Sequence, residues 1–339
     1  MRAPVASSVS LEEKIEWLST PDAYPARPPR VELIETHFAY VFLAGARAYK
    51  LKKPALIHGV DLSRLAERER RCREELIVNR RLAAPTYLGL VALVRRGREL
   101  VLAGTGTAVE WLVEMRALDR AQMLDARLAA GSVRPADWAT LVAHLRSLDP
   151  PALAGRAAAP GGPDPGVRFR LEEALREVAR PEFELAPADH RVLAGALRAA
   201  YADLVPQLAG RAARVRDGHG DLRAEHVWLG HPLQIIDALE FDPGLRWLDP
   251  AEDVAMLAVD VERCAGAAAR EALCAAYEAV AGDALAPALW SFYLALRAVT
   301  RAKVALWHML DPRPSTDATH WQRRALDYLG HAARLLELR

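Results

Sequence analysis

The chain has 339 residues, 52% of them hydrophobic, which is enough apolar material for roughly two to three domains or for one fold with two unequal lobes. Lys and Arg total 45 against 44 Asp and Glu, so the net charge of +1 lacks the basic surplus typical of nucleic-acid binders, and we expect no nucleic-acid partner. The three cysteines, Cys72, Cys264 and Cys274, are too few and too scattered for a disulfide framework or a zinc site.

The N-terminal residues lack the apolar segment of a signal peptide, and no run approaches the roughly 18 uninterrupted apolar residues that a membrane span requires. We therefore expect a cytoplasmic protein with no membrane partner. The apolar helix faces do not separate core from interface, so the oligomeric state is left open.

The first third of the chain is predicted to be rich in β-strands. After an N-terminal helical extension, residues 1–28, short runs of β-branched and aromatic residues alternate with turns. Pro54 ends one of these runs, and a helix rich in Arg and Glu follows from about residue 62 to residue 82. The predicted strands cover residues 31–34, 40–43, 48–52, 88–94, 100–103 and 109–115.

Beyond residue 119, Ala, Leu and Arg dominate and their spacing is helical. The predicted helices cover residues 119–130, 136–148, 168–180, 187–208, 250–263, 266–281, 284–309 and 318–337. A Pro/Gly/Ala-rich loop, 149–166, and a polar segment, 217–243, interrupt them. The order predicts an α+β, bilobal nucleotide-binding fold, with a small antiparallel β lobe at 29–113 and a large helical lobe at 114–339.

Segment 217–243 holds most of the residues that suit catalysis. The strand-like run 233–236 delivers Asp237 to its end, and residues 227–229 are predicted to pair with that run as a hairpin. This arrangement would place Asp221 and Asp237 on one side of a cleft. Phosphoryl transfer needs a carboxylate near the attacking hydroxyl, a role that suits Asp221, and a metal-binding carboxylate, a role that suits Asp237.

The same segment resembles the catalytic loop of protein kinases, H-R-D-L-x-x-x-N. It reads His219-Gly-Asp-Leu-Arg-Ala-Glu-His, in the H-G-D form typical of aminoglycoside phosphotransferases and their relatives. Residues 35–54, 246–262 and 301–306 resemble a bacterial aminoglycoside-phosphotransferase-like family whose members often carry an additional C-terminal P-loop kinase domain. The resemblance covers roughly residues 20–310 and implies a protein-kinase-like fold. Because the chain has no G-x-x-x-x-G-K-[ST] motif, we expect that additional domain to be absent.

The resemblance implies roles for the residues of the loop. Asp221 would orient or deprotonate the acceptor hydroxyl, His219 would brace the loop backbone, and Arg223 would contact the γ-phosphate. Asp237 would hold Mg²⁺. The position that is Asn in kinases is His226, whose imidazole is a poorer ligand for Mg²⁺ and would instead contact phosphate or favour Mn²⁺.

The resemblance also implies a lysine–glutamate pair at the nucleotide phosphates. Ala48-Tyr49-Lys50 resembles the end of the V-A-I-K motif, and strand alternation puts Lys52 on the same face; we favour Lys50 and keep Lys52 open. Glu75 lies on the inward stripe of the following helix and is the preferred partner, with Glu74 as the alternative.

Three further positions complete the expected nucleotide site. Thr36 falls where kinases carry a glycine-rich flap, and its hydroxyl would cradle phosphate although the loop contains no glycine. Glu114 and Met115 fall in the expected hinge, where backbone groups would bind adenine. Lys53 is interpreted as a solvated residue of a basic edge strand.

Three functions are compatible with this pattern. The first is an ATP-dependent phosphotransferase, using ATP and Mg²⁺ or Mn²⁺, with a hydroxyl of a small molecule as acceptor. The second is a non-catalytic nucleotide-binding regulator, suggested by His226 and the glycine-free flap. The third is a metal-dependent hydrolase with a transition metal on His219, Asp221, His226 and Asp237. The acceptor is not predicted: a sugar, an amino alcohol, a nucleoside-like metabolite or a protein side chain would each fit.

Overall fold

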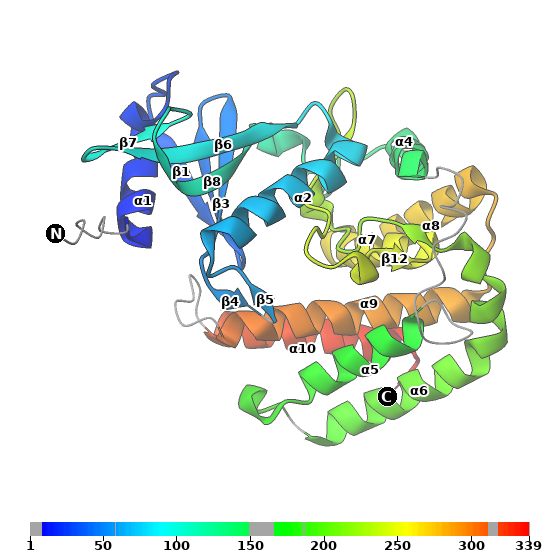
Figure 1. Ribbon diagram of the computed structural model, residues 1–339. Coiled ribbons are helices and arrows are strands. Elements are labelled where there is room, and N and C mark those ends of the chain that lie inside the picture. The colour runs from blue at the N-terminus through cyan, green and yellow to red at the C-terminus, as the bar shows by residue number, and fades with distance from the viewer. Residues whose placement is uncertain (1–8, 58, 149–165, 186, 311–317, 339) are drawn as a thin grey trace. The chain divides into compact units, whose positions relative to one another are not determined.

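The computed structural model describes residues 9–57, 59–148, 166–185, 187–310 and 318–338, and the chain divides into two compact units, Met1–Asp119 and Arg120–Arg339 (Figure 1). The predicted lobe boundary at residue 113 falls inside strand β8 (Thr107–Arg116), so the first unit continues beyond it. The described part of the predicted N-terminal extension belongs to the same unit. The predicted loop at 149–166 lies, up to residue 165, outside the described residues.

A six-stranded antiparallel sheet forms the first unit, with the strand order β1-β2-β3-β8-β6-β7. Every strand of this sheet corresponds to one predicted from β-branched and aromatic runs. Beside β8, the strands are β1 (Val31–Glu35), β2 (Ala39–Ala44), β3 (Arg47–Lys52), β6 (Tyr87–Arg96) and β7 (Glu99–Leu102). A separate two-stranded pair, β4 (Leu56–Ile57) and β5 (Val60–Asp61), follows β3.

The two faces of β3 carry different chemistry. Tyr49 and Leu51 point into an apolar cluster that also holds Leu18 and Tyr24. The alternate residues Lys50 and Lys52 point to the opposite face, toward helix α2 (Leu65–Ala83), which packs on β8 and β6. Period-two alternation therefore separates an apolar core from a charged face on a single strand.

Helix α1 (Leu11–Leu18) is fastened to the sheet by a buried ion pair. Ser10 and Glu13 form a capping box at its start. Lys14 Nζ donates to Glu110 of β8 at 3.0 Å, and the same carboxylate accepts a bidentate pair from Arg68 of α2. One glutamate thus joins three elements of the first unit.

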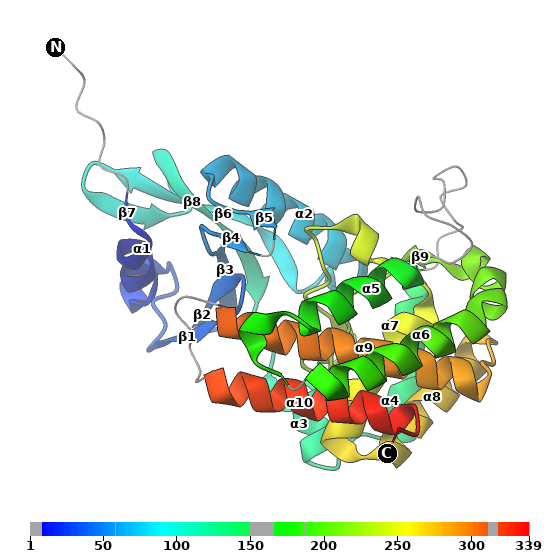
Figure 2. The same ribbon diagram turned by 90° about the horizontal axis from the view of Figure 1, so that it is seen from below.

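The second unit is helical apart from short strand pairs. Its helices are α3 (Leu124–Ala129), α4 (Pro135–Leu145), α5 (Val167–Val178), α6 (Pro187–Gly210), α7 (Pro250–Ala265), α8 (Ala267–Ala281), α9 (Pro287–Trp307) and α10 (Ala318–Leu335). Helix α9 packs against α7, α10 and α5, and both views show α9 and α10 side by side (Figures 1 and 2). The strand pairs are β9 (Arg216–Asp217) with β12 (Trp247–Leu248), and β10 (Val227–Trp228) with β11 (Gln234–Ile235).

Helix α7 is the centre of the second unit. It is buried from Ala251 to Val261, and the buried face includes the carboxylates of Glu252, Asp253 and Asp260. Such carboxylates remain in a core only when they are paired. The β9–β12 pair joins Asp217, at the start of segment 217–243, to Trp247, which lies three residues before α7 begins. Among the described helices, none is both long and apolar enough to cross a membrane.

Candidate active site

In the first unit, two lysines of β3 share one glutamate of α2. Lys52 Nζ donates to Glu75 Oε2 at 2.6 Å, and Lys50 Nζ lies 2.9 Å from Glu75 Oε1. Glu75 is fully buried, whereas Glu74 pairs with Arg70 and Arg71 on the outer side of the helix. Two ammonium groups therefore gather around one carboxylate, and ammonium groups of this kind can bind anionic phosphates.

Lys53 was expected to be solvated on a basic edge strand, and the structure shows instead that it is buried. Lys53 is only 8% exposed. Its Nζ donates to Glu35 Oε1 at 2.6 Å and lies over the ring of Tyr40. The pair joins the residue that follows β3 to the last residue of β1. The sequence pattern missed it because the partner comes from another strand.

The turn between β1 and β2 uses the polar groups of Thr36 internally. Thr36 Oγ1 donates to the carbonyl of Ala39 at 2.9 Å and accepts from the amide of Ala39 at 3.0 Å. The Thr36 amide donates to the same carbonyl. The hydroxyl that was predicted to cradle phosphate therefore closes its own turn in this structure, and the phosphate contact stays a prediction.

Glu114 and Met115, the residues predicted to bind adenine, lie within strand β8. Glu114 pairs with Tyr49 on β3 and with Gly89 on β6, and Met115 pairs with Ala48 and Tyr87. Because β8 is flanked on both sides, the backbone groups of these two residues belong to the sheet. The connection between the two units follows Arg116.

In the second unit, the H-G-D loop is held by Asp253 in the first turn of α7. Its carboxylate accepts hydrogen bonds from the amides of His219 at 2.6 Å and Gly220 at 3.1 Å. Gly220 has φ +85°, and a Cβ there would lie 3.0 Å from the carbonyl oxygen of Leu245. A glycine between His219 and Asp221 is therefore required by both backbone conformation and space.

Both ring nitrogens of His219 are engaged within the loop. Nε2 lies 2.8 Å from the carbonyl oxygen of Ile236, so it carries the proton and donates. Nδ1 accepts from the amide of Asp221 at 3.3 Å. This geometry is that of a backbone brace and leaves no lone pair for a metal, which removes one ligand from the hydrolase hypothesis.

Asp221 is an ionised carboxylate between two arginines. Arg223 Nε lies 3.1 Å from Oδ2, and Arg301 Nη1 lies 4.0 Å from Oδ1. Burial raises the pKa of Asp221, but Arg223, His226 and Arg301 outweigh it and lower the pKa to about 2. The carboxylate is thus charged at neutral pH and able to accept a proton or a hydrogen bond from a hydroxyl.

Arg301 is a site residue that the sequence analysis did not single out. It comes from α9, it is buried, and it lies 3.9 Å from Asp260 Oδ1 of α7 as well as near Asp221. The hydroxyl of Tyr328 donates to Asp260 at 3.0 Å and lies 3.4 Å from Arg301 Nη2. The one signal in the sequence was the resemblance of segment 301–306 to the family pattern.

Asp237 ends the β10–β11 hairpin in an unusual backbone conformation. Its φ is +63°, a left-handed value that is uncommon outside glycine and often found at functional sites. Its side chain is 41% exposed, so carboxylate oxygens of the kind that Mg²⁺ prefers are accessible here. Asp237 therefore fits the role of a metal ligand.

His226 fits that role poorly. Its Nδ1 lies 2.9 Å from the carbonyl oxygen of Asp221 and its Nε2 lies 2.6 Å from Arg223 Nη2. Because a carbonyl only accepts and a guanidinium only donates, Nδ1 carries the proton and the Nε2 lone pair is taken by Arg223. Burial lowers the pKa of His226 to about 4, so the ring is neutral at pH 7. Within the described ranges, no cluster of three or more His, Cys, Asp and Glu side chains is arranged to hold a metal ion.

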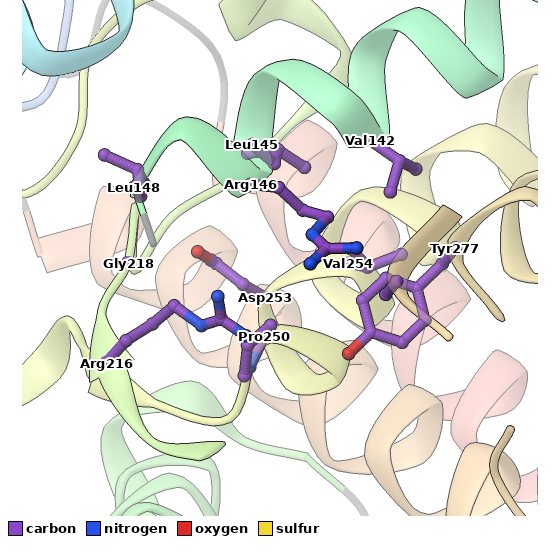
Figure 3. Close-up of a pocket in the computed structure, with 11 residues that line it drawn as sticks. Val142, Leu145, Arg146, Leu148, Arg216, Gly218, Pro250, Asp253, Val254 and Tyr277 are labelled. Carbon is purple, nitrogen blue, oxygen red and sulfur yellow. The ribbon is translucent and has the colours of Figure 1, made fainter. Parts of the chain in front are cut away.

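A small cavity of about 30 Å³ borders the loop anchor (Figure 3). Arg146, Arg216, Asp253 and Tyr277 surround it. Gly218 also lines it, whereas Asp221 is not in its wall. Its volume suits one or two water molecules and not a nucleotide. We therefore place the candidate active site at the loop and not in this cavity.

Solved structures with the same fold are small-molecule kinases by name. The choline kinase of Cryptosporidium parvum superposes with a TM-score of 0.55 at 10% identity, covering 96% of both chains. A choline/ethanolamine kinase family protein from Mesorhizobium loti gives 0.53 at 18% identity, over 96% of this chain and 98% of its own. The chain has the protein-kinase-like fold. APH(2")-IIia, solved as a complex with GDP and kanamycin, gives 0.53 at 14% identity over 95% and 98% of the two chains.

The predicted fold is therefore confirmed, as an α+β chain with an antiparallel sheet followed by a helical part. Among curated proteins, uncharacterized proteins of Mycobacterium tuberculosis and Mycobacterium bovis are 32% identical over 333 residues. The alignment covers 94% of this chain and 64% of theirs, so the chain spans less than two thirds of these relatives. No protein-family profile matches the chain.

Proposed function

We propose that this protein transfers the γ-phosphate of ATP to a hydroxyl group of a small molecule. The observation that carries the proposal is Asp221, an ionised carboxylate on a loop whose two preceding amides are bound by the buried Asp253. The structural neighbours that are named as choline or ethanolamine kinases support a small acceptor.

The residues divide the work between the two units. Lys50, with Lys52, would bind nucleotide phosphates from the face of β3 that is turned toward Glu75 of α2. Asp221 would orient the acceptor hydroxyl and accept its proton, while Arg223 would neutralise charge on the phosphoryl oxygens. Asp237 would hold Mg²⁺, which when bound neutralises phosphate charge. Positioning and charge neutralisation supply most of the rate in such transfers.

Thermal melting tests the nucleotide site before any acceptor is known. We expect ATP with Mg²⁺ or Mn²⁺ to raise the melting temperature of the wild type, because a ligand that binds the native state stabilises it by mass action. The metal-dependent part of the shift should vanish in Asp237→Ala. The matched control is Asp242→Ala, which removes a nearby carboxylate that only caps Gly244.

Catalysis is tested next with a panel of sugars, amino alcohols and nucleosides, by following ADP formation. Asp221→Asn should retain the melting shift and lose transfer. Full transfer activity in Asp221→Asn would rule out the role given to this carboxylate, and no melting shift with any nucleotide would rule out the proposed function.

A non-catalytic nucleotide-binding regulator remains the second candidate. Two observations favour it: the Thr36 hydroxyl closes its own turn, and both His226 nitrogens are occupied by protein groups. This candidate predicts a melting shift without ADP formation under every metal and acceptor. Transfer to any acceptor that requires Asp221 would exclude it.

A further inference from the structure

Arg223 lies where a kinase-type site would use a second metal ion. In protein kinases two divalent ions are held by the metal Asp and by the Asn of the catalytic loop. The corresponding residues here are Asp237 and His226, whose Oδ2 and Nε2 atoms are 3.6 Å apart. The guanidinium of Arg223 is bound to that same Nε2 atom at 2.6 Å.

Anionic and lone-pair groups surround this guanidinium on three sides. Its Nε lies 3.1 Å from Asp221 Oδ2, its Nη1 pairs with Glu225 Oε1, and its Nη2 donates to His226 Nε2. Two carboxylates and an imidazole lone pair are the groups that would attract a divalent ion. Here a planar cation of the protein already satisfies them.

Backbone hydrogen bonds fix the orientation of His226 relative to Arg223. His226 is buried, and its Nδ1–H donates to the carbonyl of Asp221, so the ring turns its Nε2 lone pair toward Arg223. The carbonyl of His226 accepts from the amide of Ile236 at 2.9 Å, which holds the residue beside the hairpin. A metal ion on Nε2 would have to displace Arg223, because a single lone pair serves one partner.

We infer that the guanidinium of Arg223 takes the place of the second divalent ion, so that this protein handles its nucleotide with one metal ion and one fixed arginine. The inference rests on the proposed function and concerns which groups neutralise the negative charge of the nucleotide phosphates. An arginine binds phosphate oxygens through two parallel N–H groups and stays charged at every physiological pH. One divalent ion at Asp237 then suffices for nucleotide binding.

The test counts metal ions per bound nucleotide. The purified chain is dialysed to equilibrium with Mn²⁺ and a non-hydrolysable ATP analogue, and bound Mn²⁺ and nucleotide are each measured from the difference across the membrane. We expect one Mn²⁺ per bound nucleotide in the wild type. The electron paramagnetic resonance signal of free Mn²⁺ gives an independent count.

Variants separate the role of Arg223 from a general loss of charge. The double variant Arg223→Ala with His226→Asn restores an oxygen ligand and removes the guanidinium, and should bind two Mn²⁺ per nucleotide. Arg223→Lys keeps a cation and should stay at one. Arg120→Ala is the matched control, since Arg120 pairs with Asp125 on the exposed surface, and it should also stay at one.

Two Mn²⁺ per nucleotide in the wild type would overturn this inference alone, because nucleotide would still be bound. One Mn²⁺ in the double variant, with nucleotide bound, would overturn the role given to Arg223. If no nucleotide is retained by the wild type, the proposed function falls, and this inference falls with it.

Discussion

Asp253 Oδ2 accepts a hydrogen bond of 2.6 Å from the backbone amide of His219, across 34 residues of sequence, and Oδ1 accepts a second from Gly220. The carboxylate also lies so close to Gly218 that a Cβ there would come within 2.6 Å of it. The side chain of Asp253, at the start of α7, therefore packs against the backbone of the H-G-D loop. The position of Asp221 depends on this contact.

Replacing Asp253 should impair both the fold and the chemistry. Asp253→Ala would leave two buried amides without a partner, and we expect a loss of about 3 kcal/mol in the free energy of unfolding. Transfer activity should fall by on the order of 100-fold, since Asp221 loses its support. Urea unfolding at pH 7 and ADP formation measure the two effects. Asp242→Ala, at an exposed cap, should cost about 1 kcal/mol and leave activity unchanged; equal effects of the two variants would contradict the anchoring role.

Substitutions of the neighbouring glutamates Glu74 and Glu75 of α2 should differ sharply in their effect on stability. Glu75→Gln removes the buried carboxylate that Lys50 and Lys52 share, and removing one partner of a buried pair typically costs about 3–5 kcal/mol. Glu74→Gln removes an exposed helix pair and should change stability by less than about 0.5 kcal/mol. Chemical denaturation measures both. A similar loss in the two variants would mean that the buried cluster contributes no more than a surface pair.

The two lysines should separate into a nucleotide ligand and a structural residue. Lys52 is 2% exposed and hydrogen-bonded at 2.6 Å, whereas Lys50 is 9% exposed and 2.9 Å from Glu75. We therefore expect Lys50→Met to weaken ATP binding by at least about 10-fold, or roughly 1.4 kcal/mol, with the smaller loss of stability. Lys52→Met should show the reverse order. Calorimetric titration with ATP measures the loss of affinity, and urea unfolding measures the loss of stability. A larger loss of ATP affinity in Lys52→Met than in Lys50→Met would assign the phosphate contact to Lys52.

The free energy of unfolding should depend on pH through the carboxylate of Glu252. This buried carboxylate of α7 is bound by Arg170 at 2.9 Å and Arg297 at 3.0 Å. Burial raises its pKa, but Arg170 and Arg297 outweigh burial, so the folded pKa lies below the ordinary value. A lowered carboxylate pKa contributes stability that is present above the unfolded pKa of about 4.3 and is lost as the pH falls through the folded pKa.

Glu252→Gln should therefore lose about 3–5 kcal/mol at pH 7, because two buried guanidinium groups lose their anion. The difference between wild type and variant should shrink as the pH falls below the unfolded pKa of about 4.3 and through the lower folded pKa, where the wild-type carboxylate becomes protonated. Urea unfolding at a series of pH values measures it. A difference that stays constant over this range would show that Glu252 does not titrate between the two states.

The pH profile of transfer should respond to Arg301. This residue is one of the cations that oppose burial and lower the pKa of Asp221 to about 2. In Arg301→Met that pKa should rise, and the acid limb of kcat/KM should move to higher pH. Tyr328→Phe removes a hydroxyl bound to Asp260 but keeps the Arg301 charge, so its acid limb should stay in place. Identical limbs in all three proteins would show that Arg301 does not act on Asp221.

Local patterns in the sequence were sufficient to predict the strands, the helices and which of the neighbouring charged residues face inward. Period-two alternation predicted that Lys50 and Lys52 share a face, and helical spacing selected Glu75 over Glu74 as the inward residue. The hairpin that carries Asp237 followed from two short apolar runs around a turn. These features involve residues that are close in sequence, where backbone geometry alone determines which side chains face one another.

Contacts between distant segments were decided only by the tertiary structure. Lys53 was assigned to solvent because its partner Glu35 lies on another strand. Asp253 and Arg301 lie on helices far along the chain from the loop that they support. Charged residues at such positions look like surface residues in the sequence, since burial and pairing depend on which helices pack together. The sequence by itself therefore determined the strands, the helices and the reactive loop, whereas packing decided which charges are buried around Asp221.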